Sequence, residues 1–155
     1  MKTYRLKTEL WLPQKRETIF DFFANPVNLD RLTPAWLKFQ ILSPQSTIMG
    51  AGTLLDYRLR LRGIPIRWQS EISIWEPPHR FVDRQTKGPY SLWRHEHTFA
   101  DENGGTLVGD SVEYAALGGS LVQKLLVAPD LARIFQYRYK ILEALFNPIA
   151  RSPGG

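Results

Sequence analysis

The chain contains no cysteine, which excludes disulfide bonds, thiol nucleophiles and thiolate metal sites. It has no apolar run approaching the ~20 residues that a membrane-spanning helix requires. The N-terminal segment alternates polar and apolar residues and lacks the continuous apolar core of a signal peptide. We therefore expect a cytoplasmic protein with no integral membrane association.

Several catalytic and cofactor-binding motifs are also missing. The sequence has no Gly-x-Ser-x-Gly motif, no Walker motif and no dinucleotide-binding fingerprint. These absences remove the usual evidence for a serine nucleophile, a nucleotide or a nicotinamide cofactor. We expect the protein to use no cofactor.

The charge is basic but dispersed. The net charge is +5, and no run of five like charges occurs. Arg58, Arg60 and Arg62 lie on the polar face of one expected strand, without interleaved aromatic residues on that face. Binding of single-stranded nucleic acid uses such aromatic residues, so a solvated outer face is the preferred interpretation. We expect no nucleic-acid partner.

The 155 residues fit one domain, which we place at 1–150, followed by a disordered tail at 151–155. Period-two patterns predict strands at 3–12, 37–43, 53–62, 64–75, 79–86, 91–100 and 105–115. Helical spacing predicts helices at 14–24, 27–32, 121–127 after a Ser120 N-cap, and 130–146, with Pro129 in a first turn. Antiparallel hairpins with segregated helices indicate an α+β fold, and a helix across a curved sheet leaves room for a pocket.

Polar residues alternate with large aromatic residues in the middle of the chain. One expected strand places Trp93, His95 and His97 on the same face. The strand before it places Asp83 and Gln85 together on one face. The hairpin between these strands puts Asp83 opposite His95 or Trp93. A face this apolar belongs on the concave side of the sheet, so its polar groups should come inside with it.

The next hairpin, which turns at 102–105, extends this set. It places His97 opposite Asp110 and Trp93 opposite Tyr114. Burying carboxylates and imidazoles is costly unless they pair with one another. Three interpretations stay open: a hydrogen-bond network that ties the strands together, polar contacts to a ligand, or proton transfer by His95 or His97 with Asp110.

A zinc site would need further ligands. His95-x-His97 projects two imidazoles to one side of a strand, and Asp110 could add a carboxylate. The pattern is short and common, and nothing else in the sequence completes a ligand shell. We expect no bound metal.

Four segments resemble the START-like superfamily, also called SRPBCC or helix-grip, and in particular bacterial ligand-binding SRPBCC-domain and polyketide cyclase/dehydrase-like proteins. They are LTPAWLKFQIL at 32–42, YRLRLRGIPIRWQSEISIWEPPHRFVDRQTKGPYSLWRHEHTF at 57–99, GGTLVGDSVEY at 104–114 and IFQYRYKILEALF at 134–146. The resemblance implies a curved seven-stranded antiparallel sheet wrapped around a long C-terminal helix, with two short helices after the first strand. It also implies a hydrophobic cavity under that helix.

We interpret the chain as a protein that binds a hydrophobic small molecule, such as a lipid, a polyketide or an isoprenoid-like compound, without turnover. An aromatic cyclase or dehydratase using a His–Asp pair is the first alternative. A module that docks on a membrane or protein through the Trp36 region and the basic strand is the second. Peripheral membrane contact and the oligomeric state stay open.

The expected ligand contacts are apolar walls and polar groups. Helical phase leaves it open whether Tyr137 and Arg138 add a hydroxyl and a cation. The expected walls are Trp36, Leu55, Tyr57, Leu59, Trp68, Ile72, Trp93, Tyr114, Phe135 and Tyr139, and the expected polar groups are Asp83, Gln85, His95, His97 and Asp110.

Overall fold

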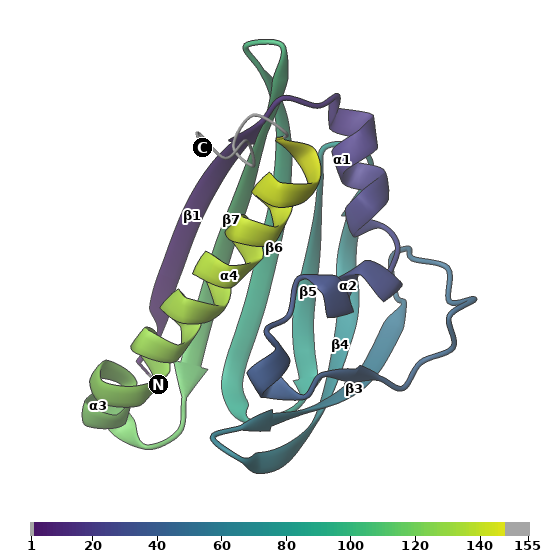
Figure 1. Ribbon diagram of the computed structural model, residues 1–155. Helices are drawn as coiled ribbons and strands as arrows, with labels where there is room; N and C mark the ends of the chain where they lie inside the picture. Colours follow the sequence, from purple (N-terminus) through teal and green to yellow (C-terminus); the bar gives the residue numbers. More distant parts are fainter. Residues whose placement is uncertain (1, 148–155) are drawn as a thin grey trace.

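The alternating segments of the sequence form one antiparallel sheet in a computed structural model that describes residues 2–147 (Figure 1). The spatial order is β1-β7-β6-β5-β4-β3-β2. The strands are β1 (Tyr4–Leu12), β2 (Gln40–Ile41), β3 (Leu54–Leu61), β4 (Ile64–Glu76), β5 (Arg80–Lys87), β6 (Tyr90–Glu102) and β7 (Gly105–Ala116). The expected tail at 151–155 and the last three residues of the expected domain lie outside the described residues.

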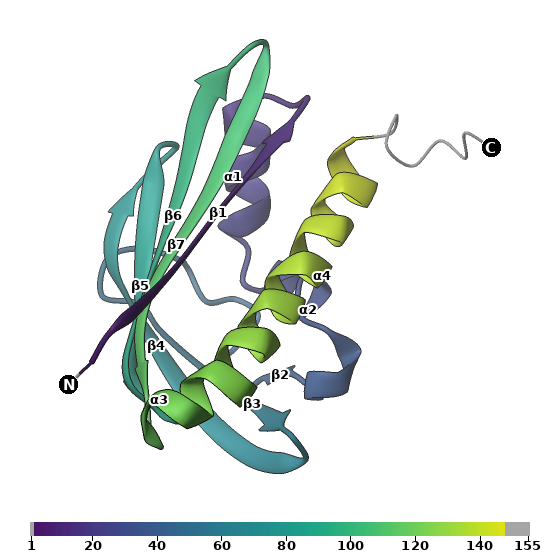
Figure 2. The same ribbon diagram turned by 90° about the vertical axis from the view of Figure 1, so that its left-hand side faces the viewer.

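The helices all lie on one side of this sheet (Figure 2). They are α1 (Arg16–Phe23), α2 (Val27–Arg31), the 3-10 helix η1 (Ala35–Leu37), α3 (Gly119–Val122), the π-helix η2 (Gln123–Val127) and α4 (Ala128–Phe146). The curved sheet wraps around α4, which crosses its concave face, while α1 and α2 cover the part of that face beside it (Figures 1 and 2). None of the helices within 2–147 is both long and apolar enough to cross a membrane.

Tight turns set the register of the hairpins. In the β6–β7 turn, both Asn103 and Gly104 have positive φ, as a two-residue turn of type I′ requires. This turn pairs His97 with Asp110 and Trp93 with Tyr114, as the sequence predicted. Asp83 pairs with His95, which was one of the two predicted registers.

Two local predictions were wrong. The strand expected at 37–43 is reduced to β2, because Leu37 turns inward in η1 and packs against Leu59 and Trp68. The helix expected to start after a Ser120 N-cap begins after Gly118, whose φ of 100° suits glycine, and Ser120 lies inside α3. The expected first-turn position of Pro129 is confirmed in α4.

The apolar core is divided along the length of α4. At one end, Leu12, Ile19 and Leu142 are completely buried between α1, the sheet and the C-terminal half of α4. Towards the other end, separate clusters form around Phe135 and around Trp68. Burial of apolar surface at both ends holds α4 in place, and the clusters leave a space between them.

Candidate ligand-binding site

A cavity of about 190 Å³ lies between the concave face of the sheet, α4 and the segment 23–39. Most of its lining is aliphatic or aromatic, which is typical of small-molecule sites. Ten of the residues that the sequence predicted as ligand contacts line it: Leu55, Tyr57, Leu59, Trp68, Ile72, Asp83, Trp93, His95, His97 and Phe135.

The predicted contacts omitted the part of the lining that comes from the segment 23–39. Phe23 in α1, Leu32 directly after α2, and Leu37 in η1 close the cavity from this side. Arg138 on α4, whose direction the helical phase left open, lines the cavity as well and is only 6% exposed. Periodicity shows which face of a short helix is apolar but does not show which part of the sheet that face approaches. The lone cation on the apolar face of α4 was the available indication for Arg138.

Five predicted contacts lie outside the lining: Trp36, Gln85 and Tyr114, and also Asp110 and Tyr139. Trp36 is 55% exposed and packs edge-on against Tyr137 at the surface. The side chain of Gln85 bonds both the backbone N–H and the carbonyl of Tyr90, so it holds the β5–β6 turn. Tyr114 is buried in the cluster around Phe135, and its hydroxyl accepts a hydrogen bond from Gln123 at 2.6 Å.

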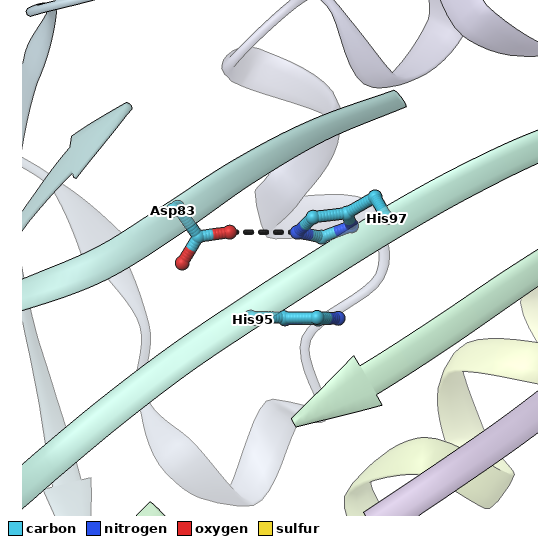
Figure 3. A group of neighbouring side chains, drawn as sticks. All are labelled: Asp83, His95 and His97. Carbon is cyan, nitrogen blue, oxygen red and sulfur yellow. Dashed lines mark hydrogen bonds and ion pairs between the residues drawn. The ribbon is translucent and has the colours of Figure 1, made fainter. Parts of the chain in front are cut away.

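Two carboxylate–imidazole pairs form the polar floor of the cavity, and Figure 3 shows three of the four residues, Asp83, His95 and His97. His97 Nε2 lies 2.6 Å from Asp83 Oδ2, and His95 Nε2 lies 2.7 Å from Asp110 Oδ1. Both bonds run diagonally, because the residue directly opposite Asp83 is His95 and the one opposite Asp110 is His97. Diagonal neighbours on adjacent strands are within reach of long side chains.

Asp110 connects the floor to α4 and β1. It does not line the cavity but lies beneath it, 2% exposed. The Tyr139 hydroxyl donates to Asp110 Oδ2 at 3.0 Å and also contacts the Thr8 hydroxyl. Arg138 Nη2 lies 3.4 Å from Asp110 Oδ1. Tyr139 therefore supports the site from behind instead of forming a wall.

The charged groups of this floor stabilise one another. Burial and the neighbouring His95 lower the pKa of His97 to about 4, so its ring is neutral at pH 7. A neutral ring that donates Nε2–H to Asp83 leaves Nδ1 as an acceptor for Arg138 Nη2 at 3.4 Å. Burial opposes ionisation of Asp110, but Arg138 and His95 outweigh it and hold the pKa of Asp110 below its usual range.

Asp83 is ionised as well. Burial again opposes ionisation, but the hydrogen bond from His97 outweighs it and lowers the pKa of Asp83. The guanidinium of Arg138 acts in the same direction. The floor therefore holds two carboxylates and one guanidinium around two stacked imidazoles.

Solved structures of similar shape are numerous. Protein CV1439 from Chromobacterium violaceum has a TM-score of 0.73 at 15% identity, covering 93% of this chain and 97% of that one. Ginseng major latex-like protein 151 from Panax ginseng has a TM-score of 0.70 at 13% identity, covering 94% and 99%. Ara h 8.0201, a Bet v1-like protein, has a TM-score of 0.67 at 16% identity, covering 93% and 97%.

The chain has the helix-grip fold. This confirms the fold that the START-like resemblance implied. No protein-family model matches the sequence, and the search of curated proteins found no significant match. At this level of identity, the likeness establishes the architecture of the helix-grip sheet and helix but not a reaction or a ligand.

Two of the cavity's polar atoms that have no hydrogen-bond partner among residues 2–147 belong to the carboxylate–imidazole pairs of the floor. They are Asp83 Oδ1 and His95 Nδ1, and neither is among the fully buried polar atoms that lack a hydrogen bond. Both atoms therefore keep accessible surface on residues that line the cavity. They are the groups best placed to contact a polar atom of a bound molecule.

Proposed function

We propose that the protein binds a small hydrophobic molecule in the cavity under α4, without chemical change of that molecule. The observation that carries the proposal is an apolar cavity of about 190 Å³ with a few polar atoms gathered on its floor. The helix-grip fold is suited to hydrophobic ligands. An engineered apolar cavity of about 150 Å³ holds benzene, so this volume favours a compact ligand of about one or two rings.

The polar floor favours a ligand with a hydrogen-bond donor. Tyr57 and Trp68 do not compete for it, because both bond to the Ser70 hydroxyl, at 2.9 and 3.0 Å. Asp83 Oδ1 is a free, charged acceptor on the lining. Hydrogen bonds to charged groups are stronger than neutral ones, so a ligand hydroxyl would gain most by donating to this carboxylate.

Native mass spectrometry of the protein purified from its own host tests whether it carries a molecule. Leu59→Trp fills the cavity, because Leu59 lines it and is 8% exposed. Leu54→Trp on the same strand is the matched control, because Leu54 is 47% exposed and does not line the cavity. We expect the extra mass in the wild type and in Leu54→Trp but not in Leu59→Trp.

A pair of probes tests binding without knowledge of the natural ligand. Propylbenzene and 4-propylphenol differ by one hydroxyl group, and we expect the phenol to bind more tightly. Asp83→Asn should weaken 4-propylphenol about tenfold, which corresponds to one hydrogen bond to a charged group, and should leave propylbenzene unchanged. If neither probe binds and no molecule is retained, the proposal is wrong.

The His95–Asp110 pair supports a second candidate, an enzyme of the aromatic cyclase or dehydratase kind. Asp110 bonds Nε2 of His95 and so orients the ring, while Nδ1 stays open to the cavity. A histidine oriented in this way is suited to proton transfer. Incubation of the retained molecule with wild type and His95→Gln separates the two. Product formed only by the wild type supports the enzyme, and an unchanged molecule supports the binding protein.

A further inference from the structure

Three potential metal ligands converge on the cavity floor. Asp83 on β5 and His95 and His97 on β6 each offer one ligand atom, and these atoms all lie within 4.8 Å of one another (Figure 3). His95 and His97 are each 6% exposed, so the group is not a chance cluster of surface side chains. We propose that Asp83, His95 and His97 form a site for a divalent transition-metal ion, with Zn²⁺ as the reference ion.

The hydrogen bonds determine which nitrogen of each ring is available. His95 Nε2 is engaged by Asp110 on β7, so His95 Nδ1 is the free ligand atom. The two nitrogens of an imidazole point in different directions, so the contact with β7 occupies Nε2 and leaves Nδ1 without a hydrogen bond. His97 Nε2 already faces Asp83 on β5. One carboxylate oxygen and two ring nitrogens, one from each histidine, therefore lie within 4.8 Å of one another between β5 and β6.

Asp110 supplies the outer partner that histidine ligands of metals usually have. Such ligands commonly donate their second ring N–H to a carboxylate, which fixes the ring and strengthens the ligand. Asp110 Oδ1 accepts from His95 at 2.7 Å and lies 3.6 Å from His97 Nδ1. A metal ion on His97 Nε2 would place the proton of this ring on Nδ1, which would give up its contact with Arg138 Nη2 and turn to Asp110 Oδ1, now 3.6 Å away. One carboxylate can then orient both imidazoles.

The local charge also favours a cation. Metal ligation requires neutral imidazoles. With both rings neutral, Asp83, Asp110 and Arg138 leave the buried floor with a net charge of −1. A divalent ion needs ligand atoms about 3.3 Å apart in a tetrahedral site, so the widest spacing, up to 4.8 Å, must contract by about 1.5 Å. Three protein ligands beside an open cavity leave the fourth position for water or a small molecule.

The proposal is tested on chelator-treated protein by calorimetric titration with Zn²⁺ and by absorption spectroscopy with Co²⁺. We expect one ion per chain and the ligand-field bands of four-coordinate Co²⁺. Asp83→Asn and His95→Gln should each weaken Zn²⁺ binding more than tenfold, and Asp110→Asn about 10–100-fold. His79→Gln is the matched control, because the chain has three histidines and His79 is exposed.

Absence of stoichiometric binding overturns the proposal, as does equal binding by the wild type, Asp83→Asn and His95→Gln. Loss of binding in His79→Gln overturns it too, because the ion would then lie at the surface. If a variant fails to fold, imidazole NMR of the wild type decides. Zn²⁺ must shift the ring resonances of His95 and His97 but not those of His79. The 4-propylphenol titration is made with a chelator present, so its result does not depend on a bound metal ion. Failure of either proposal therefore leaves the other testable.

Discussion

His95 and His97 stack with ring centroids 3.7 Å apart, yet their Nε2 atoms bond to carboxylates on opposite neighbouring strands. His95 reaches Asp110 on β7, and His97 reaches Asp83 on β5. Side chains of one strand thus connect three strands at the bottom of the cavity. Because each buried carboxylate has its own imidazole, the floor keeps its geometry without a bound molecule.

Asp110 should be the most sensitive residue of this floor. Asp110→Asn removes the negative charge beside Arg138, which is 6% exposed, and should lower the free energy of unfolding by about 3–5 kcal/mol. Glu113→Gln on the same strand breaks an exposed ion pair with Arg5 and should cost less than about 1 kcal/mol. Urea denaturation of both variants measures the difference. Equal losses of unfolding free energy in the two variants would show that the buried contacts of Asp110 do not stabilise the protein more than the exposed ion pair does.

The Tyr139 hydroxyl should contribute to stability through Asp110. Tyr139→Phe loses the 3.0 Å bond to Asp110 and the contact with Thr8, and should cost about 1 kcal/mol of unfolding free energy. Tyr137→Phe is the control on the same helix, because the Tyr137 hydroxyl has no hydrogen-bond partner within 2–147. Its effect should stay within about 0.5 kcal/mol. A loss from Tyr137→Phe as large as that from Tyr139→Phe contradicts the assignment.

The division of the core along α4 predicts unequal costs of truncation. Leu142 is 0% exposed in the packed end, so Leu142→Ala should lower the unfolding free energy by about 2–5 kcal/mol. Ile134 lines the cavity and already borders empty space, so Ile134→Ala should cost at least about 1 kcal/mol less. Thermal and chemical denaturation check the order. A reversed order would mean that the cavity is filled by side chains.

Ligand entry should be visible in tryptophan fluorescence. Trp68 and Trp93 line the cavity with ring centroids 5.3 Å apart, whereas Trp11 bonds to the Glu102 carbonyl at the surface. Addition of 4-propylphenol should change the emission of the wild type and of Trp11→Phe. The change should be smaller in Trp68→Phe and in Trp93→Phe. An undiminished change in both of these variants would place the probe elsewhere.

The register of the hairpins could be predicted because local chemistry determines it. Asn103 and Gly104 specify a tight turn, and counting back from it places His97 opposite Asp110. The actual bonds could not be predicted in this way. His97 bonds to Asp83 and not to the residue opposite it, because strand twist and side-chain rotamers decide which neighbour a ring reaches.

The carboxylate ligand of the proposed metal site could not be identified from the sequence either. The sequence suggested Asp110 as the carboxylate that would join His95 and His97. In the structure, Asp110 lies behind His95 and Asp83 lies on the open side. Both carboxylates share the inner face, and the alternation of side chains contains no information that distinguishes them.

The sequence by itself determined the antiparallel α+β design, the inner face of the central strands and the presence of both histidines on it. These properties follow from periodicity and turn chemistry, which act over a few residues. Only the tertiary structure decided that Arg138 enters the cavity, that Gln85 and Trp36 do not line it, and that Asp83 and Asp110 take different partners. Such choices depend on how α4 and the segment 23–39 approach the sheet, and that approach is set by packing between residues far apart in the chain.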